Sequence, residues 1–235
     1  MRTKHYLIDC SYICYFAGFS AFKQYCYNFD IPNTELSPDF DPTLDPEFCE
    51  IFLNTIEYSI LNPLKNNFPI VDKSKIIFCM DCPRKNIWRR EIFPGYKLDR
   101  DLQDTSKQKF NISRMFKYAN SVILPGLCEN YEAMQLRCGC AEGDDVIAVM
   151  TKYFLENTKD DVIIISCDKD MVQLANERVI ILTSDGTRRE PKIELEKAIK
   201  QKITDDITCN DFLLFKILIR RCRRWNSKCK KWYWT

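Results

Sequence analysis

The sequence predicts an α/β domain with a mostly parallel central sheet flanked by helices. Three short apolar runs are expected to form buried strands, because they lack the alternation of polar and apolar residues typical of a half-exposed strand. These runs are Tyr6–Ile8, Ile76–Met80 and Val162–Ser166. Helix-forming stretches separate them, and strands that alternate with helices are typical of a parallel sheet.

Three stretches carry the helix signals. Asp45 is expected to cap a helix that has Pro46 in its first turn and runs to about Leu61. Val146–Leu155 has helical periodicity and follows an acidic segment, and Ile193–Gln201 predicts a further helix. The chain contains no internal repeat and no low-complexity segment, and its 235 residues have room for one fairly large domain or a domain plus a small appendage.

The length and composition are those of a globular protein. The 235 residues, 46% of them hydrophobic, are enough to bury a sizeable core. No run approaches the roughly 18 apolar residues of a membrane-spanning helix. The opening residues MRTKHYLIDC lack the apolar region and cleavage site of a signal peptide. We therefore expect a cytoplasmic protein, in the host cytoplasm if its source is viral, with no membrane partner.

Cysteine usage argues against a disulfide scaffold. The thirteen Cys are scattered and odd in number, and free Cys in apolar segments packs as a small hydrophobe. Two spacings resemble zinc motifs, Cys79-x-x-Cys82 and Cys138-x-Cys140, but neither has a well-spaced partner pair. The only His is His5, which we expect to be structural. Zinc is therefore not expected.

Charge is unevenly distributed along the chain, although its net value is only +2. The last sixteen residues, 220–235, contain seven Lys or Arg, no Asp or Glu, and three of the four Trp. Without them, residues 1–219 contain 28 Lys or Arg and 33 Asp or Glu, so this part of the chain is mildly acidic. Within residues 1–219, the basic segment Arg84–Lys117 contains ten Lys or Arg and four Asp or Glu, interleaved with aromatic residues. This segment fits contact with a phosphate backbone.

Carboxylates follow each of the three predicted strands. In open α/β sheets, ligands bind at the carboxyl ends of the strands, so acids at equivalent strand ends are expected to share one cleft. A further acidic group, in CAEGDDVIAVM, stands at a predicted helix N-terminus. The candidates are Asp9, Asp81, Asp168 and Asp170 after the strands, with Glu142, Asp144 and Asp145 at the helix.

Such a cluster indicates metal chemistry. Neighbouring carboxylates raise each other's pKa, so the cluster stays ionised at neutral pH only with bound cations. Oxygen ligands select the hard ions Mg²⁺ or Mn²⁺, and two such ions can clamp the attacking and leaving oxygens of a phosphodiester. Nucleotide binding by a Gly-x-x-x-x-Gly-Lys loop is excluded, since the chain lacks that motif. Asp168-Lys-Asp170-Met-Val172 also matches the first motif of haloacid-dehalogenase-like phosphatases, although the later motifs are missing.

Five segments in order resemble 5′-nucleases of the flap endonuclease type, in particular the phage RNase H branch. They read LIDCS, FCMDCPRKNIWRR, GYKLDRD, AEGDDVIAV and IISCDKDMVQL, and their order and approximate spacing fit the family from about residue 6 to 185. The resemblance implies a PIN-like nuclease core over residues 1–219, with a helical arch at about residues 83–125. Two positions depart from the family pattern: Gly143 stands where Ala is usual, and Cys167 where Gly or Ser is usual.

The resemblance also implies roles for individual residues. Lys97 and Arg100 would orient the scissile phosphate from in or beside the arch. The incoming strand would be contacted by Arg84, Lys85, Arg89 and Arg90. Two Mg²⁺ ions, replaceable by Mn²⁺, would be held by Asp9, Asp81, Glu142, Asp144, Asp168 and Asp170, with Asp145 as a further candidate.

The implied activity is 5′→3′ exonuclease and flap cleavage on DNA or RNA–DNA with a 5′ end or flap, including removal of RNA primers in replication. A monomer is expected, with a single-strand-binding or clamp protein as a possible partner at the fork. Two alternatives stay open: a nucleic-acid-binding protein that uses the fold without cleavage, and the dehalogenase-like phosphatase. PIN-type ribonucleases are related but have fewer acids and shorter chains.

Residues 220–235 do not match the family. After FLLFKIL the family continues with Gly-Asp-x-x-Asp and a helix–three-turn–helix that grips duplex DNA. If the coding sequence is read one base later, a Trp codon before Asn, Tyr or Thr becomes a glycine codon. Glycine then replaces Trp225, Trp232 and Trp234, at positions that suit the family motif. Our hypothesis is a single-base frameshift near Ile219 or Arg220, which would weaken the second metal site; the alternative is a genuine tail that binds single strands.

Overall fold

The fold is built on a sheet buried on both faces. The computed structural model describes residues 2–32, 36–98, 102, 105–200 and 202–225, with side chains as far as Leu218. Within these residues, six strands form one sheet in the order β3-β2-β1-β4-β5-β6. They are β1 (Lys4–Asp9), β2 (Ile76–Met80), β3 (Met134–Arg137), β4 (Asp161–Ile165), β5 (Val179–Leu182) and β6 (Arg188–Arg189).

The strand pairing confirms the predicted fold class. All neighbouring strands pair in parallel except β6, which runs antiparallel to β5. The three predicted strands correspond to β1, β2 and β4, with ends displaced by at most two residues. β2 and most of β4 are fully buried, which explains why they read as unbroken apolar runs.

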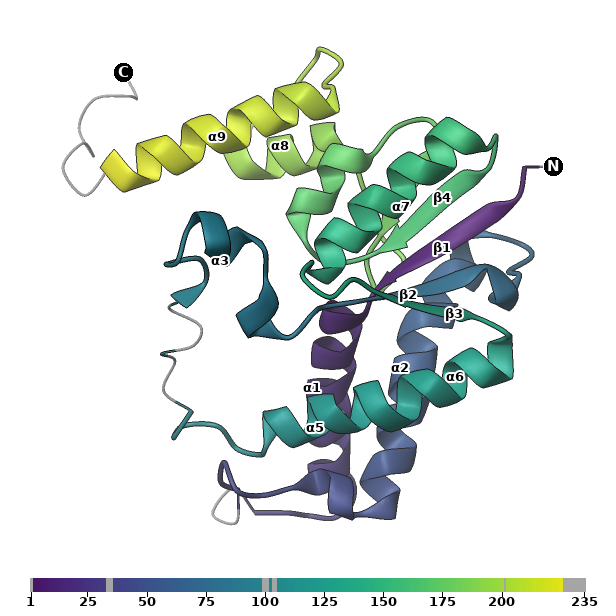
Figure 1. The fold of residues 1–235 in the computed structure, drawn as a ribbon, viewed down its shortest axis with the longest axis vertical. Coiled ribbons are helices and arrows are strands. Elements are labelled where there is room, and N and C mark those ends of the chain that lie inside the picture. Colours follow the sequence, from purple (N-terminus) through teal and green to yellow (C-terminus); the bar gives the residue numbers. More distant parts are fainter. Residues whose placement is uncertain (1, 33–35, 99–101, 103–104, 201, 226–235) are drawn as a thin grey trace.

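Helices cover both faces of the sheet. Along β1, Tyr6 and Ile8 face a cluster formed with α1, α2, α5 and α6, whereas Leu7 faces the opposite cluster under α7. This alternation places the sheet in the middle of three layers (Figure 1). The helices are α1 (Cys10–Asn28), α2 (Pro46–Asn67), α3 (Arg89–Ile92), α5 (Ile112–Tyr118), α6 (Leu124–Tyr131), α7 (Gly143–Asn157), α8 (Pro191–Ile199) and α9 (Cys209–Trp225).

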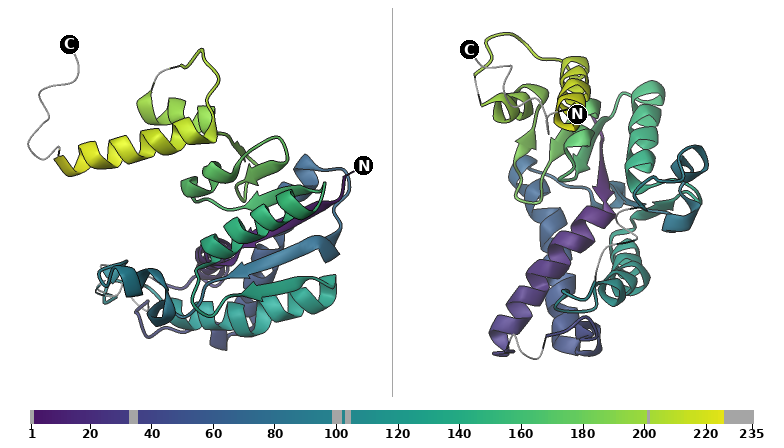
Figure 2. Two further views of the ribbon diagram at one scale, coloured as in Figure 1. Left: turned by 45° about the horizontal axis from the view of Figure 1, so that its top comes forward. Right: turned by 90° about the vertical axis from the view of Figure 1, so that its left-hand side faces the viewer.

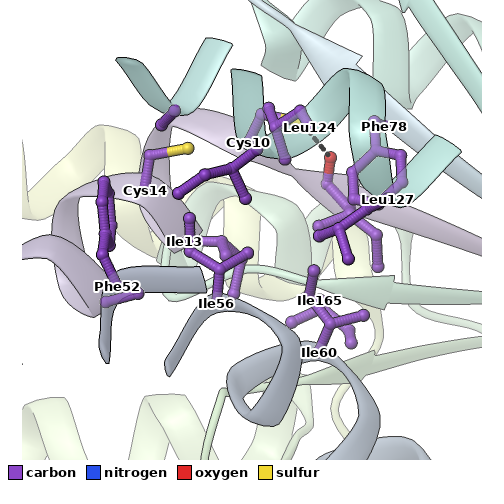
Figure 3. Close-up of a cluster of buried hydrophobic side chains, with 14 of the residues drawn as sticks. Cys10, Ile13, Cys14, Phe52, Ile56, Ile60, Phe78, Leu124, Leu127 and Ile165 are labelled. Carbon is purple, nitrogen blue, oxygen red and sulfur yellow. Dashed lines mark hydrogen bonds between the residues drawn. The ribbon is translucent and has the colours of Figure 1, made fainter. Parts of the chain in front are cut away.

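The main core lies between the sheet and the α1–α2 pair. Figure 3 shows Ile13 of α1 and Ile56 and Ile60 of α2 facing Phe78 of β2 and Ile165 of β4. All five side chains are fully buried. Burial of this kind contributes about 1.5–3 kcal/mol for each large apolar side chain, so this interface holds α1 and α2 against the sheet.

The predicted helices are confirmed with changed ends. The side chain of Asp45 caps α2 as expected, accepting a hydrogen bond from the backbone N–H of Glu47. α2 continues two turns beyond the predicted end, through Pro63 to Asn67. The other two predicted helices correspond to α7 and α8. α8 ends at Ile199, two residues before the predicted end at Gln201, which lies outside the described residues. Among the described residues, no helix combines the length and apolar character needed to cross a membrane.

Helix α1 was missed because it is apolar on more than one side. Ile13 and Ala17 are fully buried against the core, yet Tyr15, Phe16 and Phe19 are exposed on the same helix. Without a polar face the sequence lacks the helical period that marks α2 or α7. His5 is structural, as expected: its ring stacks on Phe154 with centroids 3.9 Å apart.

The last two helices form a separate packing unit. Val172, Leu195 and Phe212 make a small third cluster that joins α8 and α9 to the segment after β4. Both helices lie at the end of the molecule opposite α1 and α2 (Figure 2). The predicted boundary between the nuclease domain and the unmatched tail, at residue 220, falls within α9, whose helical backbone extends to Trp225. Residues 226–235 lie outside the described part. The predicted arch contains α3 and α5, while residues 99–101 and 103–104 lie outside the description.

Candidate metal centre and its basic surroundings

The strand order creates a crevice at one edge of the sheet. β1 lies between β2 and β4. The connection from β1 to β2 runs through α1 and α2 on one face of the sheet, and the connection from β3 to β4 runs through α7 on the other face. Ligands of open α/β sheets bind outside the carboxyl ends of the strands at such a reversal. In Figure 1 these ends point toward the side on which α3 lies.

Asp9 occupies this reversal. It is the last residue of β1, it is only 6% exposed, and it caps α1 by accepting a 3.1 Å hydrogen bond from the N–H of Tyr12. Its Oδ2 accepts a 2.6 Å bond from the hydroxyl of Ser166. Burial raises the pKa of Asp9; these hydrogen bonds offset part of that, and Asp81 and Asp168 raise it further.

Asp81 stands at the equivalent position after β2. Its Oδ1 accepts a hydrogen bond of 2.5 Å from the N–H of Gly143, the first residue of α7, and its Oδ2 accepts one from the hydroxyl of Ser11. A Cβ at position 143 would lie 3.1 Å from Asp81 Oδ1 and 3.1 Å from the carbonyl oxygen of Cys79. The glycine thus permits close approach between the β2 end and the helix that carries the other acids.

Asp144 is the acid whose pKa is influenced by all three of the other carboxylates. Burial raises its pKa to about 7, with further contributions from Asp9, Asp168 and Asp81, while Lys97 opposes the shift. No hydrogen bond to its carboxylate is found among the described residues. Asp144 is thus a carboxylate held among three like charges, as expected of residues that share one cleft.

Asp168 and Asp170 lie in the turn after β4. The N–H of Asp168 donates to the hydroxyl of Ser166, and Asp168 Oδ1 accepts from the N–H of Asp170 at 2.8 Å. The structure therefore links this turn to Asp9 through Ser166. Asp170 forms an ion pair with the ammonium group of Lys216 on α9. The charge of one predicted metal ligand is thus neutralised by a helix in which no site residue was predicted.

The donor set fits a hard divalent cation. Asp9, Asp81, Asp144 and Asp168 provide only carboxylate oxygens, and their mutual repulsion is the kind that a bound Mg²⁺ or Mn²⁺ relieves. As placed, no group of three or more His, Cys, Asp or Glu side chains among the described residues is arranged to hold an ion. The fit therefore rests on donor chemistry and electrostatic coupling.

Glu142 is held by three groups from the basic segment. Lys97 Nζ lies 2.5 Å from its Oε1, while Tyr96 donates at 2.8 Å and Arg89 at 3.2 Å to its Oε2. The carboxylate is buried, so these contacts compensate a charge that would otherwise be costly. Lys97 has a left-handed backbone with φ of 54°, an uncommon conformation for a residue with a side chain. The metal role of Glu142 and the phosphate role of Lys97 stay predictions.

Asp145 is bound by residues of the basic segment. It accepts two hydrogen bonds from Arg89, of 2.7 and 2.5 Å, and one of 3.2 Å from the indole N–H of Trp88. Burial raises the pKa of Asp145, but the bonds from Arg89 and Trp88 outweigh it and leave the pKa below its usual value. In this structure Asp145 therefore ties the basic segment to the start of α7.

The other described basic candidates lie in the segment that follows Asp81. Arg84 and Lys85 are exposed in a short 3₁₀ helix that begins three residues after Asp81, and Arg90 follows Arg89 in α3. Arg100 lies outside the described residues, so its predicted contact with the scissile phosphate has no structural counterpart here. Their nucleic-acid contacts stay predictions.

Sequence reasoning missed several polar partners of the site. Ser11 and Ser166 stand two residues from Asp9 and Asp168 within the quoted motifs, and that spacing to an acid was the available signal. Tyr96 and Trp88 were noted only as aromatic residues between charges, although both bind carboxylates of α7. Lys216 carried no signal, because its contact depends on how α9 packs.

Comparison with known proteins places the chain in a family. A family model described as the 5′-3′ exonuclease N-terminal resolvase-like domain matches residues 53–204. The chain belongs to this family, which confirms the resemblance to 5′-nucleases. Asp9 precedes the matched span, so its assignment rests on the geometry described above.

Individual relatives agree with this placement. A 5′-3′ exonuclease of Buchnera aphidicola subsp. Schizaphis graminum (strain Sg) is 32% identical over 124 residues, which cover 53% of this chain and 38% of the relative. The chain thus matches little more than a third of that relative's length.

Two solved structures share the fold. A T5 5′-exonuclease with bound divalent zinc has a TM-score of 0.54 at 16% identity, covering 93% of this chain and 75% of that one. A T5 D15 protein co-crystallised with metal ions has a TM-score of 0.53 at 18% identity, covering 91% and 74%. At these identities the likeness concerns the fold, and it supports the α/β architecture derived from the sheet.

Proposed function

We propose that this chain is a metal-dependent 5′-3′ exonuclease and flap endonuclease that hydrolyses phosphodiester bonds of DNA or RNA–DNA. One observation carries the proposal: four carboxylates from four separate segments influence one another electrostatically at the strand reversal. Asp144 on α7 is influenced by Asp9, Asp81 and Asp168. The family of the chain and the basic segment beside this cluster support the same reaction.

Mg²⁺, with Mn²⁺ as a substitute, is the proposed cofactor. Asp9, Asp81, Asp144 and Asp168 would hold it, with Asp170 and Glu142 available once their partners Lys216 and Lys97 move away. Bound there, divalent ions would lower the pKa of a water molecule and stabilise the negative charge that develops on a phosphodiester.

The chain's own residues have two tasks in this proposal. Asp9 and Asp81 are fixed by hydrogen bonds from Ser166, Tyr12, Ser11 and Gly143, so their oxygens are oriented before any ligand arrives. Lys97 and Arg89 supply positive charge at the edge of the cluster, and a substrate phosphate can take over the donors that now serve Glu142.

The biological setting is proposed on the same basis. Substrates with a free 5′ end or flap, including RNA primers at a replication fork, fit a single-strand entrance lined by Arg84, Lys85, Arg89 and Arg90. A monomer in the cytoplasm, of phage origin and aided by a single-strand-binding or clamp protein, completes the proposal. The hypothesis that residues 220–235 reflect a frameshift stays a prediction, which resequencing of codons 217–222 tests.

A cleavage assay tests the proposed function. A 5′-labelled flap is incubated with the protein and Mg²⁺, with and without a chelator. We expect short 5′ products that disappear on chelation and fall at least about 100-fold in Asp9→Asn and Asp144→Asn. Asp205→Asn, an exposed acid remote from the sheet reversal, serves as the matched control.

Each contrary result has a defined meaning. Tight flap binding without cleavage at any Mg²⁺ concentration would favour the non-cleaving binding protein. Hydrolysis of small phosphate esters that is lost in Asp168→Asn, with flap DNA left intact, would favour the dehalogenase-like phosphatase.

A further inference from the structure

Two exposed thiols face each other at the turn that leads into the candidate metal centre. Cys138 and Cys140 lie between the end of β3 and the start of α7, and their Sγ atoms are 3.9 Å apart. Both side chains are exposed. We propose that this pair is a redox-active dithiol that closes reversibly to a Cys138–Cys140 disulfide.

The turn has room to close. A disulfide bond measures about 2.05 Å between its sulfurs, so the two thiols need to approach by roughly 2 Å. The single intervening residue is Gly139, and an added side-chain carbon there would meet nothing within 4 Å. Gly139 gives the backbone freedom to tighten, and the open space around it leaves no packing to disrupt. A bond across so short a loop is strained and therefore readily reversed.

Cys138 has the character of the attacking thiol. Its pKa lies below the ordinary value because the backbone N–H of Cys140 and then the Cys140 side chain donate to its sulfur. The buried thiols have the opposite environment: burial raises the pKa of Cys14 and of Cys79 to about 12. Since the thiolate is the reactive species, an oxidant reaching this protein is directed to the exposed pair.

The reaction balances with a small-molecule disulfide as co-reactant. The Cys138 thiolate attacks one sulfur of that disulfide, forming a mixed disulfide and releasing one small thiol. Cys140 then loses its proton to solvent and attacks the Cys138 sulfur, which forms the internal disulfide and releases the second thiol. The protein loses two electrons and two protons, and the small disulfide is reduced to two thiols.

Zinc binding is a less suitable role for Cys138 and Cys140 than redox chemistry. A structural zinc needs four ligands, and no group of three His, Cys, Asp or Glu that could hold an ion is present in the part of the chain that the structure describes. Two thiols without further ligands are better suited to redox chemistry.

The position of the pair gives the disulfide a structural consequence. The carbonyl of Cys140 accepts a 2.8 Å hydrogen bond from the N–H of Trp88, and the next carbonyl, of Ala141, accepts one of 3.0 Å from the N–H of Cys82. These bonds hold the chain after β2 against the start of α7. Drawing the two sulfurs together displaces the peptide unit of Cys140 and loosens the bond to Trp88.

Peptide mapping of the full-length protein tests the proposal. The protein is treated with oxidised glutathione and digested with trypsin, which releases residues 138–152 as one peptide. We expect this peptide to lose the mass of two hydrogen atoms and to regain it with dithiothreitol. In Cys138→Ser and Cys140→Ser the internal bond is absent and the remaining thiol carries glutathione. Cys167→Ser, which removes the other exposed thiol of the described residues, leaves the result unchanged.

The structural consequence has its own readout. Amide hydrogen exchange at Trp88 is expected to become about tenfold faster after oxidation, in line with the loss of one backbone hydrogen bond. Persistence of two separately alkylatable thiols in residues 138–152 after oxidation would overturn the dithiol. A formed disulfide with unchanged exchange at Trp88 would overturn the link to the chain after β2. Neither readout depends on nuclease activity, so failure of the proposed function would be recognised separately.

Discussion

The hydroxyl of Ser166 donates a 2.6 Å hydrogen bond to Oδ2 of Asp9, joining the ends of β4 and β1 across the strand reversal. Ser166 is completely buried and Asp9 nearly so. The same hydroxyl accepts from the N–H of Asp168. One serine therefore orients two of the acids that we assign to the metal centre, and it does so from inside the core.

Removal of this hydroxyl should weaken metal binding more than it weakens the fold. In Ser166→Ala, Asp9 loses a hydrogen bond to its charged form, so its pKa rises further and its oxygen is no longer oriented. We expect Mn²⁺ binding, measured by isothermal titration calorimetry, to weaken about tenfold. Ser121→Ala, which removes an exposed hydroxyl bonded to its own helix, is the matched control. Equal affinities in the two variants would contradict the assigned role.

Metal affinity should depend on pH through Asp144. Its pKa is raised to about 7, and the metal competes with the proton for this carboxylate. We expect the Mn²⁺ dissociation constant to be steady above about pH 8 and to increase about tenfold per unit below pH 7, as for displacement of one proton. In Asp144→Asn the affinity should be low at every pH. A pH-independent affinity in the unaltered protein would rule out this coupling.

The same shift predicts how stability without metal varies with pH. The pKa of Asp144 is higher in the folded protein than in the unfolded chain, so between about pH 4 and pH 7 the folded state binds more protons. The contribution of Asp144 to stability is therefore greatest at low pH. It falls as pH rises through this window, by on the order of 4 kcal/mol. Urea unfolding at several pH values should show this fall, and Asp144→Asn should flatten it; a parallel profile in the variant would contradict the assignment.

Gly143 should resist substitution by alanine. A side-chain carbon would lie 3.1 Å from Asp81 Oδ1 and 3.1 Å from the carbonyl of Cys79, so α7 would have to move away from the end of β2. We expect Gly143→Ala to weaken Mn²⁺ binding about tenfold.

A second glycine provides the control for this substitution. Gly126 lies in α6, where an added carbon would meet nothing within 4 Å. Gly126→Ala should leave metal binding unchanged and stabilise the protein by about 0.4–1 kcal/mol, measured by urea unfolding. If Gly143→Ala also left metal binding unchanged, the close approach of Gly143 to Asp81 would not be needed for metal binding.

Arg89 should not be replaceable by lysine. Its guanidinium contacts both oxygens of Asp145 and one of Glu142, a geometry that an ammonium group cannot reproduce. We expect Arg89→Lys to reduce flap cleavage about tenfold and to destabilise the fold by about 1 kcal/mol, measured by a Mg²⁺-dependent assay and by thermal unfolding. Arg2→Lys, at a surface pair with Asp161, should change neither. Full activity in Arg89→Lys would show that charge alone suffices.

The fold could be predicted where burial leaves a simple pattern. The strands β1, β2 and β4 are buried on both faces, and α2 has a strong cap in Asp45, so local sequence was enough. β5 (Val179–Leu182) is a buried apolar run of the same kind that was overlooked, whereas the short strand β3 and the helix α1 gave no such pattern. β3 is partly exposed, and α1 is apolar around much of its surface, so only tertiary packing decides their conformation.

The site could be predicted as a set of acids but not as a network. The rule that ligands bind at strand ends located Asp9, Asp81 and Asp168, and the pKa of Asp144 supports their convergence. The pairing of Glu142 with Lys97 and of Asp145 with Arg89 depends on how the chain after β2 folds back over α7. Such contacts, 45 and 56 residues apart in the sequence, leave no local signal.

The most direct test of the metal centre is an anomalous difference map from a crystal soaked in Mn²⁺. The account predicts a peak at the carboxyl ends of β1, β2 and β4, with Asp9, Asp81, Asp144 and Asp168 as the protein residues around it. No peak among these four residues at saturating Mn²⁺, or a peak bound only by other residues, would contradict the account.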